Sequence, residues 1–469
     1  MIRHFVSLLA LCACTASALA TQPATLRLDY LHSGNALDEH YAIERVVVEP
    51  LPWPGSMAQT IDNSNRGNNL VEVVDANTGK LLYSRGFSTI FAEWRSTEEA
   101  ARSNRGFQES VRFPRPEQPV KVRILKRDER NLFSVVWTAD VDPNAMDVIR
   151  KQPPAPVKPI GIRVNGPSQD KVDLLIVGDG YTQADMKKFE AAARRLADHL
   201  FDTSPFKERA KDFNVWAIAL PTGESGVSRP STGSHKESPL GTRYDIFGSE
   251  RYVLTTDNRA LRELAQYAPY EFIEILVNND TYGGGGIFGQ FSTAAADNDW
   301  ANYLFVHEFG HHFAGLADEY YTSPVAYATG GERREPWEPN ATALQDPAKL
   351  KWKKFVQAGT PLPTPWPKAT YETAARAYQK ERAALRANHR PESEMSALFR
   401  KDLQHSSALF SADPHRHVVG AFEGANYEAT GYYRPEMQCL MFDRSDTFCA
   451  VCAEAIITII DLYSGSARQ

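Results

Sequence analysis

The stretch Tyr303-Leu-Phe-Val-His-Glu-Phe-Gly-His-His-Phe-Ala-Gly-Leu-Ala-Asp-Glu-Tyr-Tyr321 decides how the rest of the chain is interpreted. His307 and His311 are four residues apart, so a helix would place both imidazoles on one face, about one turn apart. Histidines at this spacing on a helix are typical ligands of a single zinc ion. The stretch therefore predicts a helix that carries two zinc ligands.

Glu308 lies beside the face that the two histidines share. A carboxylate there can accept a proton from water at the metal without taking a coordination position. Gly315 is typical of a helix end, and the turn that it allows can return Asp318 or Glu319 to the metal as a third ligand. Three protein ligands would leave a fourth position open for water, as in catalytic zinc sites.

Two histidines one helical turn apart can also be ordinary surface or hydrogen-bonded core residues. Here apolar side chains surround the pair, namely Leu304, Phe305, Val306, Phe309 and Phe313. The imidazoles would therefore be largely buried and would need polar partners. We favour a zinc ion as that partner.

The chain has 469 residues, which is more than one hydrophobic core usually supports, so two domains are expected. Its 42% hydrophobic and 23% charged residues are typical of a folded globular protein. The formal net charge of -6 gives no basic excess of the kind that nucleic-acid-binding proteins use. We therefore expect no nucleic-acid partner.

Residues 1–20 have the pattern of a secretory signal peptide. Arg3 precedes an apolar run over residues 5–14, and residues 18–20, Ala-Leu-Ala, have the small-x-small form of a cleavage site. The run is too short to span a bilayer. We expect an exported chain, periplasmic or secreted, that begins at Thr21 and has no transmembrane segment.

The cysteines bear on both the leader and the C-terminal end. Cys12 and Cys14 lie in the leader, where a lipid anchor is the lesser alternative to a free exported chain. Cys439, Cys449 and Cys452 remain after cleavage, and an odd number in an exported protein suggests one disulfide and one spare thiol. The C-x-x-C pair lacks a second Cys or His pair at zinc-finger spacing. We therefore expect no separate metal site and favour a bridge from Cys439 to one of the other two.

The first part of the chain, residues 21–150, reads as a β-sandwich-like domain. Its segments alternate or run apolar between turn residues, as strands do, at residues 25–30, 45–50, 70–74, 120–125 and 133–137. Residues 151–160 are proline-rich, which is typical of a semi-rigid linker. No catalytic constellation occurs before this linker, so packing, substrate presentation or attachment is the expected role of the domain.

The second part, residues 161–469, alternates strand and helix patterns and predicts an α/β domain. The mixed charges at about 370–410 have helical spacing and predict a solvated helical hairpin inserted into this domain. Before the histidine stretch comes Tyr282-Gly-Gly-Gly-Gly-Ile287, whose glycines allow close backbone approach. This segment is either a surface loop or an edge strand beside the cleft that an extended peptide could pair with, and its position favours the cleft.

The histidine stretch, together with Tyr433-Arg-Pro-Glu-Met-Gln-Cys-Leu-Met441, resembles the bacterial IgA-peptidase family of zinc metalloendopeptidases, which is related to the metzincins. The likeness also includes Leu174-Leu-Ile-Val-Gly-Asp-Gly-Tyr181 and Gly420-Ala-Phe-Glu-Gly-Ala425. It spans most of residues 155–465, and the β-rich first domain looks like the N-terminal domain of such proteins. The resemblance implies a metzincin-like zinc peptidase domain and a polypeptide substrate.

By this resemblance His307 and His311 match the zinc ligands, and Glu308 matches the catalytic acid and base. Met441 matches the methionine of the turn beneath the zinc in metzincins, with Met437 a weaker candidate.

The tail of the motif departs from the common metzincin pattern, because Gly315 and Asp318 are each displaced by one position. We favour Asp318 as the third ligand because its carboxylate follows the glycine turn and suits zinc. Glu319 and the distant Glu423 are the alternatives.

Tyr432 and Tyr433 precede the proposed methionine turn, and either could donate a hydrogen bond to an oxyanion, although a core role is more common for such residues.

The sequence thus predicts an α+β protein in which a β-sandwich-like domain precedes an α/β zinc endopeptidase domain. Zn²⁺ would bind His307, His311 and Asp318, and Glu308 would be the general base and acid. The main alternative is a non-catalytic protein that binds a polypeptide or a glycan and holds a structural metal. Hydrolysis of a non-peptide amide is a further alternative.

Overall fold

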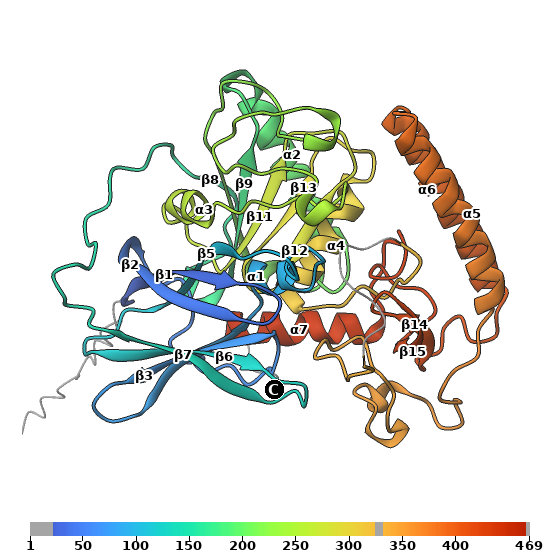
Figure 1. Ribbon diagram of the computed structural model, residues 1–469, viewed down its shortest axis with the longest axis horizontal. Helices are drawn as coiled ribbons and strands as arrows, with labels where there is room; N and C mark the ends of the chain where they lie inside the picture. Colours follow the sequence, from blue (N-terminus) through green and yellow to red (C-terminus); the bar gives the residue numbers. More distant parts are fainter. Residues whose placement is uncertain (1–21, 324–331, 466–469) are drawn as a thin grey trace, which may run out of the picture.

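The computed structural model describes residues 22–323 and 332–465. The expected signal peptide at residues 1–20, with Cys12 and Cys14, lies outside the described residues. A strand-rich N-terminal domain packs against a larger α/β domain (Figure 1). This arrangement confirms the predicted α+β fold class. No helix among the described residues has the length and apolar character needed to cross a membrane.

Two antiparallel sheets form the N-terminal domain, with strand orders β2-β1-β5 and β4-β3-β6-β7. Buried residues of both sheets, such as Leu28, Val73 and Val122, pack together between them. The burial alternates along β6 because successive side chains of a strand point to opposite faces. The strands are β1 (Ala24–Gly34), β2 (Glu39–Pro52), β3 (Asn69–Asp75), β4 (Leu81–Phe87), β5 (Arg105–Pro114), β6 (Val120–Arg127) and β7 (Phe133–Val141), with one short helix, α1 (Ile90–Arg95).

A six-stranded sheet of order β12-β13-β11-β9-β10-β8 is the centre of the second domain. Its four inner strands are parallel, and the two edge strands β8 and β12 run antiparallel to their neighbours. The strand β9 is buried along its whole length, as its continuous apolar run predicts. The strands are β8 (Ile160–Arg163), β9 (Val172–Asp179), β10 (Phe213–Ala219), β11 (Phe272–Val277), β12 (Gly284–Ile287) and β13 (Phe291–Ala295).

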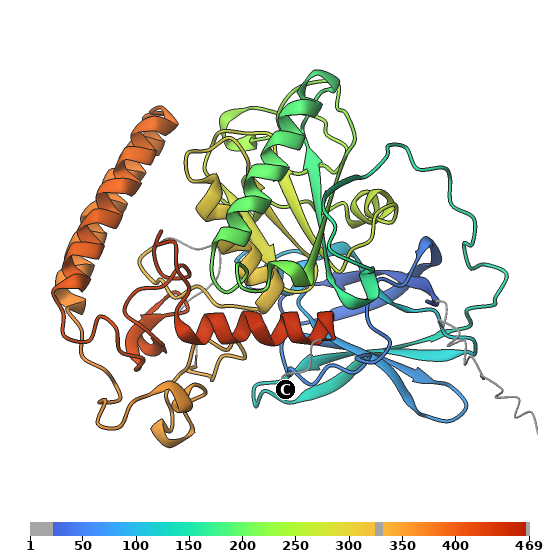
Figure 2. The same cartoon turned by 180° about the vertical axis from the view of Figure 1, so that it is seen from behind.

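Helices cover both faces of this sheet. One face contributes Leu174 and Ile176 to a core shared with α2 (Met186–Asp202), α4 (Ala301–Ala314) and α7 (Ala450–Ser464). From behind, α2 lies over the sheet and α7 crosses below it (Figure 2). The other face contributes Leu175 and Val177 to a core with α3 (Asn258–Ala265). A three-layer α/β domain results.

The two domains share buried contacts. Phe91 and Trp94 of α1 belong to the same core as α3 and the central sheet. Arg66, which is buried, donates from Nη1 to the carbonyl oxygens of Ala314 at 2.7 Å and Ala455 at 3.0 Å. The N-terminal domain thus contacts the C-terminal end of α4 directly.

The rest of the second domain lies around one end of α7. The helices α5 (Lys368–Ala387) and α6 (Glu392–Ser411) form a pair that projects beside the domain (Figure 1). They occupy the charged stretch in which the sequence predicts a helical hairpin. A short hairpin of β14 (Phe422–Ala425) and β15 (Glu428–Arg434) follows.

Candidate active site

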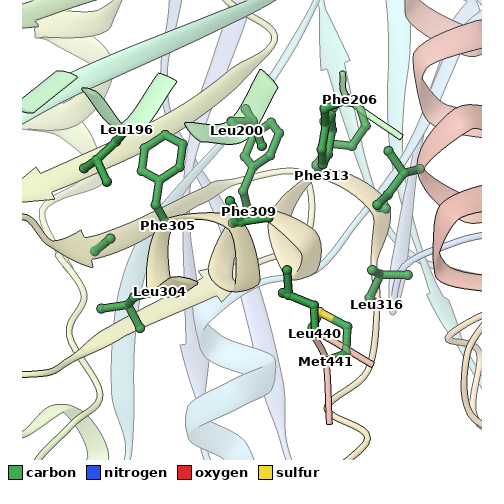
Figure 3. Packing of buried hydrophobic residues seen from close by; sticks show 14 of the residues in the cluster. Leu196, Leu200, Phe206, Leu304, Phe305, Phe309, Phe313, Leu316, Leu440 and Met441 are labelled. Carbon is green, nitrogen blue, oxygen red and sulfur yellow. The ribbon is translucent and has the colours of Figure 1, made fainter. Parts of the chain in front are cut away.

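The helix α4 presents opposite faces to the core and to the cleft. Phe305 and Phe309 point toward Leu196 and Leu200 of α2, and Phe313 lies beside Phe206 (Figure 3). The helix ends at Gly315, whose φ of 60° is the left-handed conformation that favours glycine at this position. Aromatic packing on one face therefore fixes the orientation of the polar residues on the other.

Three side-chain atoms converge on one point beside α4. The Nε2 atoms of His307 and His311 lie 3.2 Å apart, and Oδ1 of Asp318 lies 3.0 Å from the first and 3.3 Å from the second. Zinc bonds of about 2.0–2.1 Å in tetrahedral geometry require ligand atoms about 3.3 Å apart. The triangle of nitrogen and oxygen atoms fits such an ion.

The protein fixes the orientation of both imidazoles through their other nitrogen. Nδ1 of His307 lies 3.1 Å from the carbonyl oxygen of Leu440, and Nδ1 of His311 lies 2.6 Å from that of Leu316. Because a carbonyl oxygen can only accept, each Nδ1 carries the proton and donates it. Each Nε2 therefore faces the point that Asp318 shares, and it would offer a lone pair to a cation there once the imidazole is neutral.

Asp318 reaches this position from the loop after Gly315, as the turn in the sequence suggests. Its Oδ2 atom accepts a hydrogen bond from the hydroxyl of Tyr427, while Oδ1 is buried without a hydrogen bond. Burial opposes the charged carboxylate, but the charges and hydrogen bonds of the His311 and His307 imidazoles together outweigh burial and lower the pKa of Asp318 well below its usual range. An ionised carboxylate with one unsatisfied oxygen suits a divalent cation.

Glu308 lines a cleft of about 180 Å³ that also contains His311 and Asp318. Burial raises the pKa of Glu308 above its ordinary value, and the neighbouring imidazoles of His307 and His311 oppose that shift. A carboxylate whose pKa is raised toward neutrality is suited to both accepting and returning a proton.

The glycine-rich segment forms the edge strand β12 against α4, and not a free loop. A Cβ atom added to Gly286 would lie 2.5 Å from the carbonyl oxygen of Glu308 and 2.9 Å from Cβ of His311. One added to Gly284 would lie 3.3 Å from Oε1 of Glu308. Only glycine allows a strand to lie this close to the helix that carries the histidines.

The two alternative third ligands lie elsewhere. Glu423 accepts a hydrogen bond of 2.8 Å from Nζ of Lys368, and Glu319 turns away from the histidines toward the cysteines.

Met441 is fully buried, and its sulfur lies 3.1 Å from the position of a Cβ atom added to Gly310 of α4. Figure 3 shows Met441 directly beneath the helix.

Tyr432 and Tyr433 are not among the residues that line the cleft, so neither takes the lesser role of oxyanion donor that the sequence left open. The hydroxyl of Tyr432 accepts a hydrogen bond of 3.0 Å from the backbone N–H of Arg334, outside the cleft. Instead, Tyr320 and Tyr427 line the cleft together with Arg251, whose Nη2 donates to the Tyr320 hydroxyl at 3.1 Å. No short spacing to the histidines marks these residues, although Tyr320 lies at the end of the histidine stretch.

The expected disulfide is not formed. Cys439, Cys449 and Cys452 are buried free thiols, and the sulfur atoms of Cys439 and Cys452 lie 3.8 Å apart, whereas a disulfide bond measures about 2.05 Å.

Part of the cleft wall comes from the N-terminal domain. Asn68, Ser88 and Glu93 line it together with the glycines of β12. The backbone N–H of Ser88 donates to the carbonyl oxygen of Phe288 at 2.8 Å, which joins this wall to the end of β12.

Comparison with known proteins matches both parts of the chain. Residues 160–460 match the family described as IgA Peptidase M64, and residues 19–138 match the domain described as Peptidase M64 N-terminus. A comparison with curated proteins gives no match. The first match covers most of the chain and contains the histidines, the aspartate and the cleft glycines, and we conclude that this chain belongs to the IgA peptidase M64 family of peptidases.

Proposed function

We propose that this protein is an exported zinc-dependent endopeptidase in which His307, His311 and Asp318 bind the metal and Glu308 transfers the proton. The observation that carries the proposal is the triangle of three ligand atoms separated by 3.0–3.3 Å, with Glu308 on the adjoining cleft. Two imidazoles and one carboxylate are a common protein ligand set of hydrolytic zinc sites. Export rests on the leader pattern of residues 1–20.

A bound zinc ion would act as a Lewis acid toward the scissile carbonyl and the attacking water. Glu308 accepts the proton of that water and returns it to the amine that leaves. Arg251 lies in the same cleft and can stabilise negative charge on the carbonyl oxygen of the substrate.

The strand β12 is suited to positioning the peptide. It is the last strand on its side of the central sheet, and its glycines line the cleft beside Glu308. The backbone N–H and carbonyl groups of Gly284 already bond to Arg251 and Val253, so Gly286 is the residue with which a peptide would pair. An extended polypeptide can pair with such an edge through main-chain hydrogen bonds, which do not depend on the substrate sequence. The substrate class that follows is an extended polypeptide segment.

The test is hydrolysis of an unfolded protein substrate by the mature chain and by Glu308→Gln. We expect cleavage by the wild type that stops with a chelator and returns with zinc. Glu308→Gln should keep its metal but lose about 10²- to 10⁴-fold in rate, the usual contribution of a general acid and base. Equal rates for the two proteins with equal metal contents would contradict the assigned role. Metal content, measured alongside, distinguishes a lost base from a lost ion.

A further inference from the structure

A second cluster of metal-binding side chains lies next to the first. Glu319 directly follows Asp318, Cys439 lies two residues before Met441, Cys449 is the N-cap of α7, and Cys452 is in its first turn. The side chains are at most 3% exposed, and their ligand atoms all lie within 4.8 Å of one another. Three thiols and a carboxylate in a closed pocket have no role in the proposed hydrolysis.

We propose that this cluster is a second, structural metal site that binds one Zn²⁺. Its four ligands are Glu319, Cys439, Cys449 and Cys452.

The distances between the ligand atoms fit a tetrahedral ion. Zinc–sulfur bonds of about 2.3 Å require sulfur atoms about 3.8 Å apart, and a mixed sulfur–oxygen pair requires about 3.5 Å. The sulfur atoms of Cys439 and Cys452 are 3.8 Å apart. Oε1 of Glu319 lies 3.3 Å from the sulfur of Cys452 and 3.9 Å from that of Cys449.

The backbone around the cluster is arranged to stabilise thiolates. The N–H groups of Met441 and Cys449 donate to the sulfur of Cys439 at 3.5 and 3.3 Å, and the N–H of Cys452 donates to the sulfur of Cys449 at 3.4 Å. The last two N–H groups belong to the start of α7, where the helix dipole favours negative charge. Such hydrogen bonds to ligand atoms are typical of the second shell of a metal site.

The carboxylate of Glu319 is positioned in the same way. Nδ2 of Asn340 donates to Oε1 at 2.9 Å, and Oε2 is buried without a hydrogen-bond partner. Asn340 is itself fixed, because its side chain accepts from the N–H of Ala317 and donates to the carbonyl oxygen of the same residue. A buried carboxylate with one unsatisfied oxygen among three thiols is costly unless a cation is present.

The chemistry of the ligands favours zinc in a structural role. Soft thiolates select zinc over calcium or magnesium, and four protein ligands leave no position for water or substrate. Sequence spacing does not reveal this site, because the cysteines have no second pair of ligands close to them in the chain. The completing ligand, Glu319, lies 130 residues before Cys449.

A metal ion at the second site would stabilise the segments that position the ligands of the first site. The N–H of Glu319 donates to the carbonyl oxygen of Met441 at 2.9 Å, which ties the loop of Asp318 to the turn beneath α4. The same turn includes Leu440, whose carbonyl oxygen orients His307. An ion shared by Glu319 and Cys439 would cross-link these two segments.

The test is the metal content of the mature full-length chain, expressed with its leader and recovered from an oxidising compartment. We expect about two zinc ions per wild-type chain and about one in His311→Ala, which disrupts only the first site. Cys452→Ser in the His311→Ala background should bind almost none. This comparison does not depend on peptidase activity, so it separates failure of this proposal from failure of the proposed function.

Thiol chemistry provides the decisive control. Denaturation with an alkylating reagent and no reductant should modify all three thiols, whereas a disulfide would leave only one to react. His311→Ala loaded with Co²⁺ should show thiolate-to-metal charge-transfer absorption. Because this variant keeps all three cysteines, the measurement does not depend on whether Cys452→Ser folds. A disulfide in the purified chain, the absence of zinc from His311→Ala, or the absence of that absorption would each overturn the proposal.

Discussion

Met441 provides a quantitative test of how the turn beneath α4 packs against that helix. Its side chain is fully buried, with its sulfur against Gly310. Met441→Ala removes three buried heavy atoms, and at about 0.8 kcal/mol for each group the lost burial is about 2.4 kcal/mol. The cavity that remains adds to this cost, so we expect the free energy of unfolding to fall by about 2–5 kcal/mol.

The same substitution should also slow peptide hydrolysis. Leu440, the neighbour of Met441, orients His307 through its carbonyl oxygen, so a collapse of the turn moves a metal ligand. A displacement of about 1 Å at a catalytic group costs up to about 100-fold in rate, and we expect a decrease of about 10- to 100-fold in kcat.

Urea unfolding and initial rates on an unfolded protein substrate measure the two effects. Met146 is fully exposed, so Met146→Ala is the matched control and should change stability by less than about 0.5 kcal/mol. Met437 is also fully buried, and Met437→Ala tests the weaker candidate for the turn. If Met441→Ala were as stable and as active as Met146→Ala, the packing argument would be wrong. If Met437→Ala were the slower enzyme, Met437 would be the methionine of the turn.

Three further outcomes are expected. Asp318→Ala should weaken zinc binding by more than about 100-fold in a chelator competition, whereas Glu423→Ala should leave zinc binding unchanged. Weakened binding in Glu423→Ala and unchanged binding in Asp318→Ala would make Glu423 the third ligand. Gly286→Ala should lower the free energy of unfolding in urea by about 1–3 kcal/mol, because the added Cβ atom would lie 2.5 Å from a backbone oxygen. The control Gly223→Ala adds a Cβ atom with nothing within 4 Å and should lower the free energy of unfolding by less than about 0.5 kcal/mol. In the metal-free chain, burial disfavours charge on His311, but the Asp318 carboxylate, helped by Glu308 and the carbonyl oxygen of Leu316, raises the pKa of His311 to about 9. This raised pKa stabilises the fold fully below about pH 6.5, and up to about 3 kcal/mol of that stability is lost as the pH rises through 9. Melting curves of Asp318→Asn should show a much smaller pH dependence, and an equal slope in both proteins would contradict the pairing.

Much of the fold could be predicted because its signals are local. The alternating strands of the N-terminal domain and the continuous apolar run of β9 each encode burial within one element. The pairing order of the central sheet depends on contacts between segments far apart in sequence. No single stretch specifies that β13 lies between β12 and β11.

The same distinction applies to the site. Helical spacing predicts that His307, Glu308 and His311 lie together, and a glycine turn a few residues away predicts that Asp318 joins them; the structure brings all four to one cleft region. Arg251 reaches the cleft from another part of the chain, so no spacing marks it. The cysteine cluster had the strongest composition signal, but its fourth ligand is supplied by tertiary contact. For that reason the sequence alone favours a disulfide from Cys439 to Cys449 or Cys452 in place of a metal site.

The N-terminal domain forms one wall of the cleft, through Ser88, Asn68 and Glu93. The residues that would hydrolyse a peptide bond therefore lie in the α/β domain, whereas part of the cleft surface that a peptide would contact lies in the N-terminal domain. Changes in the segment around Ser88 would alter which peptides enter without altering the hydrolytic residues. Selectivity and chemistry can then diverge separately, and two relatives with the same histidine helix need not accept the same substrates.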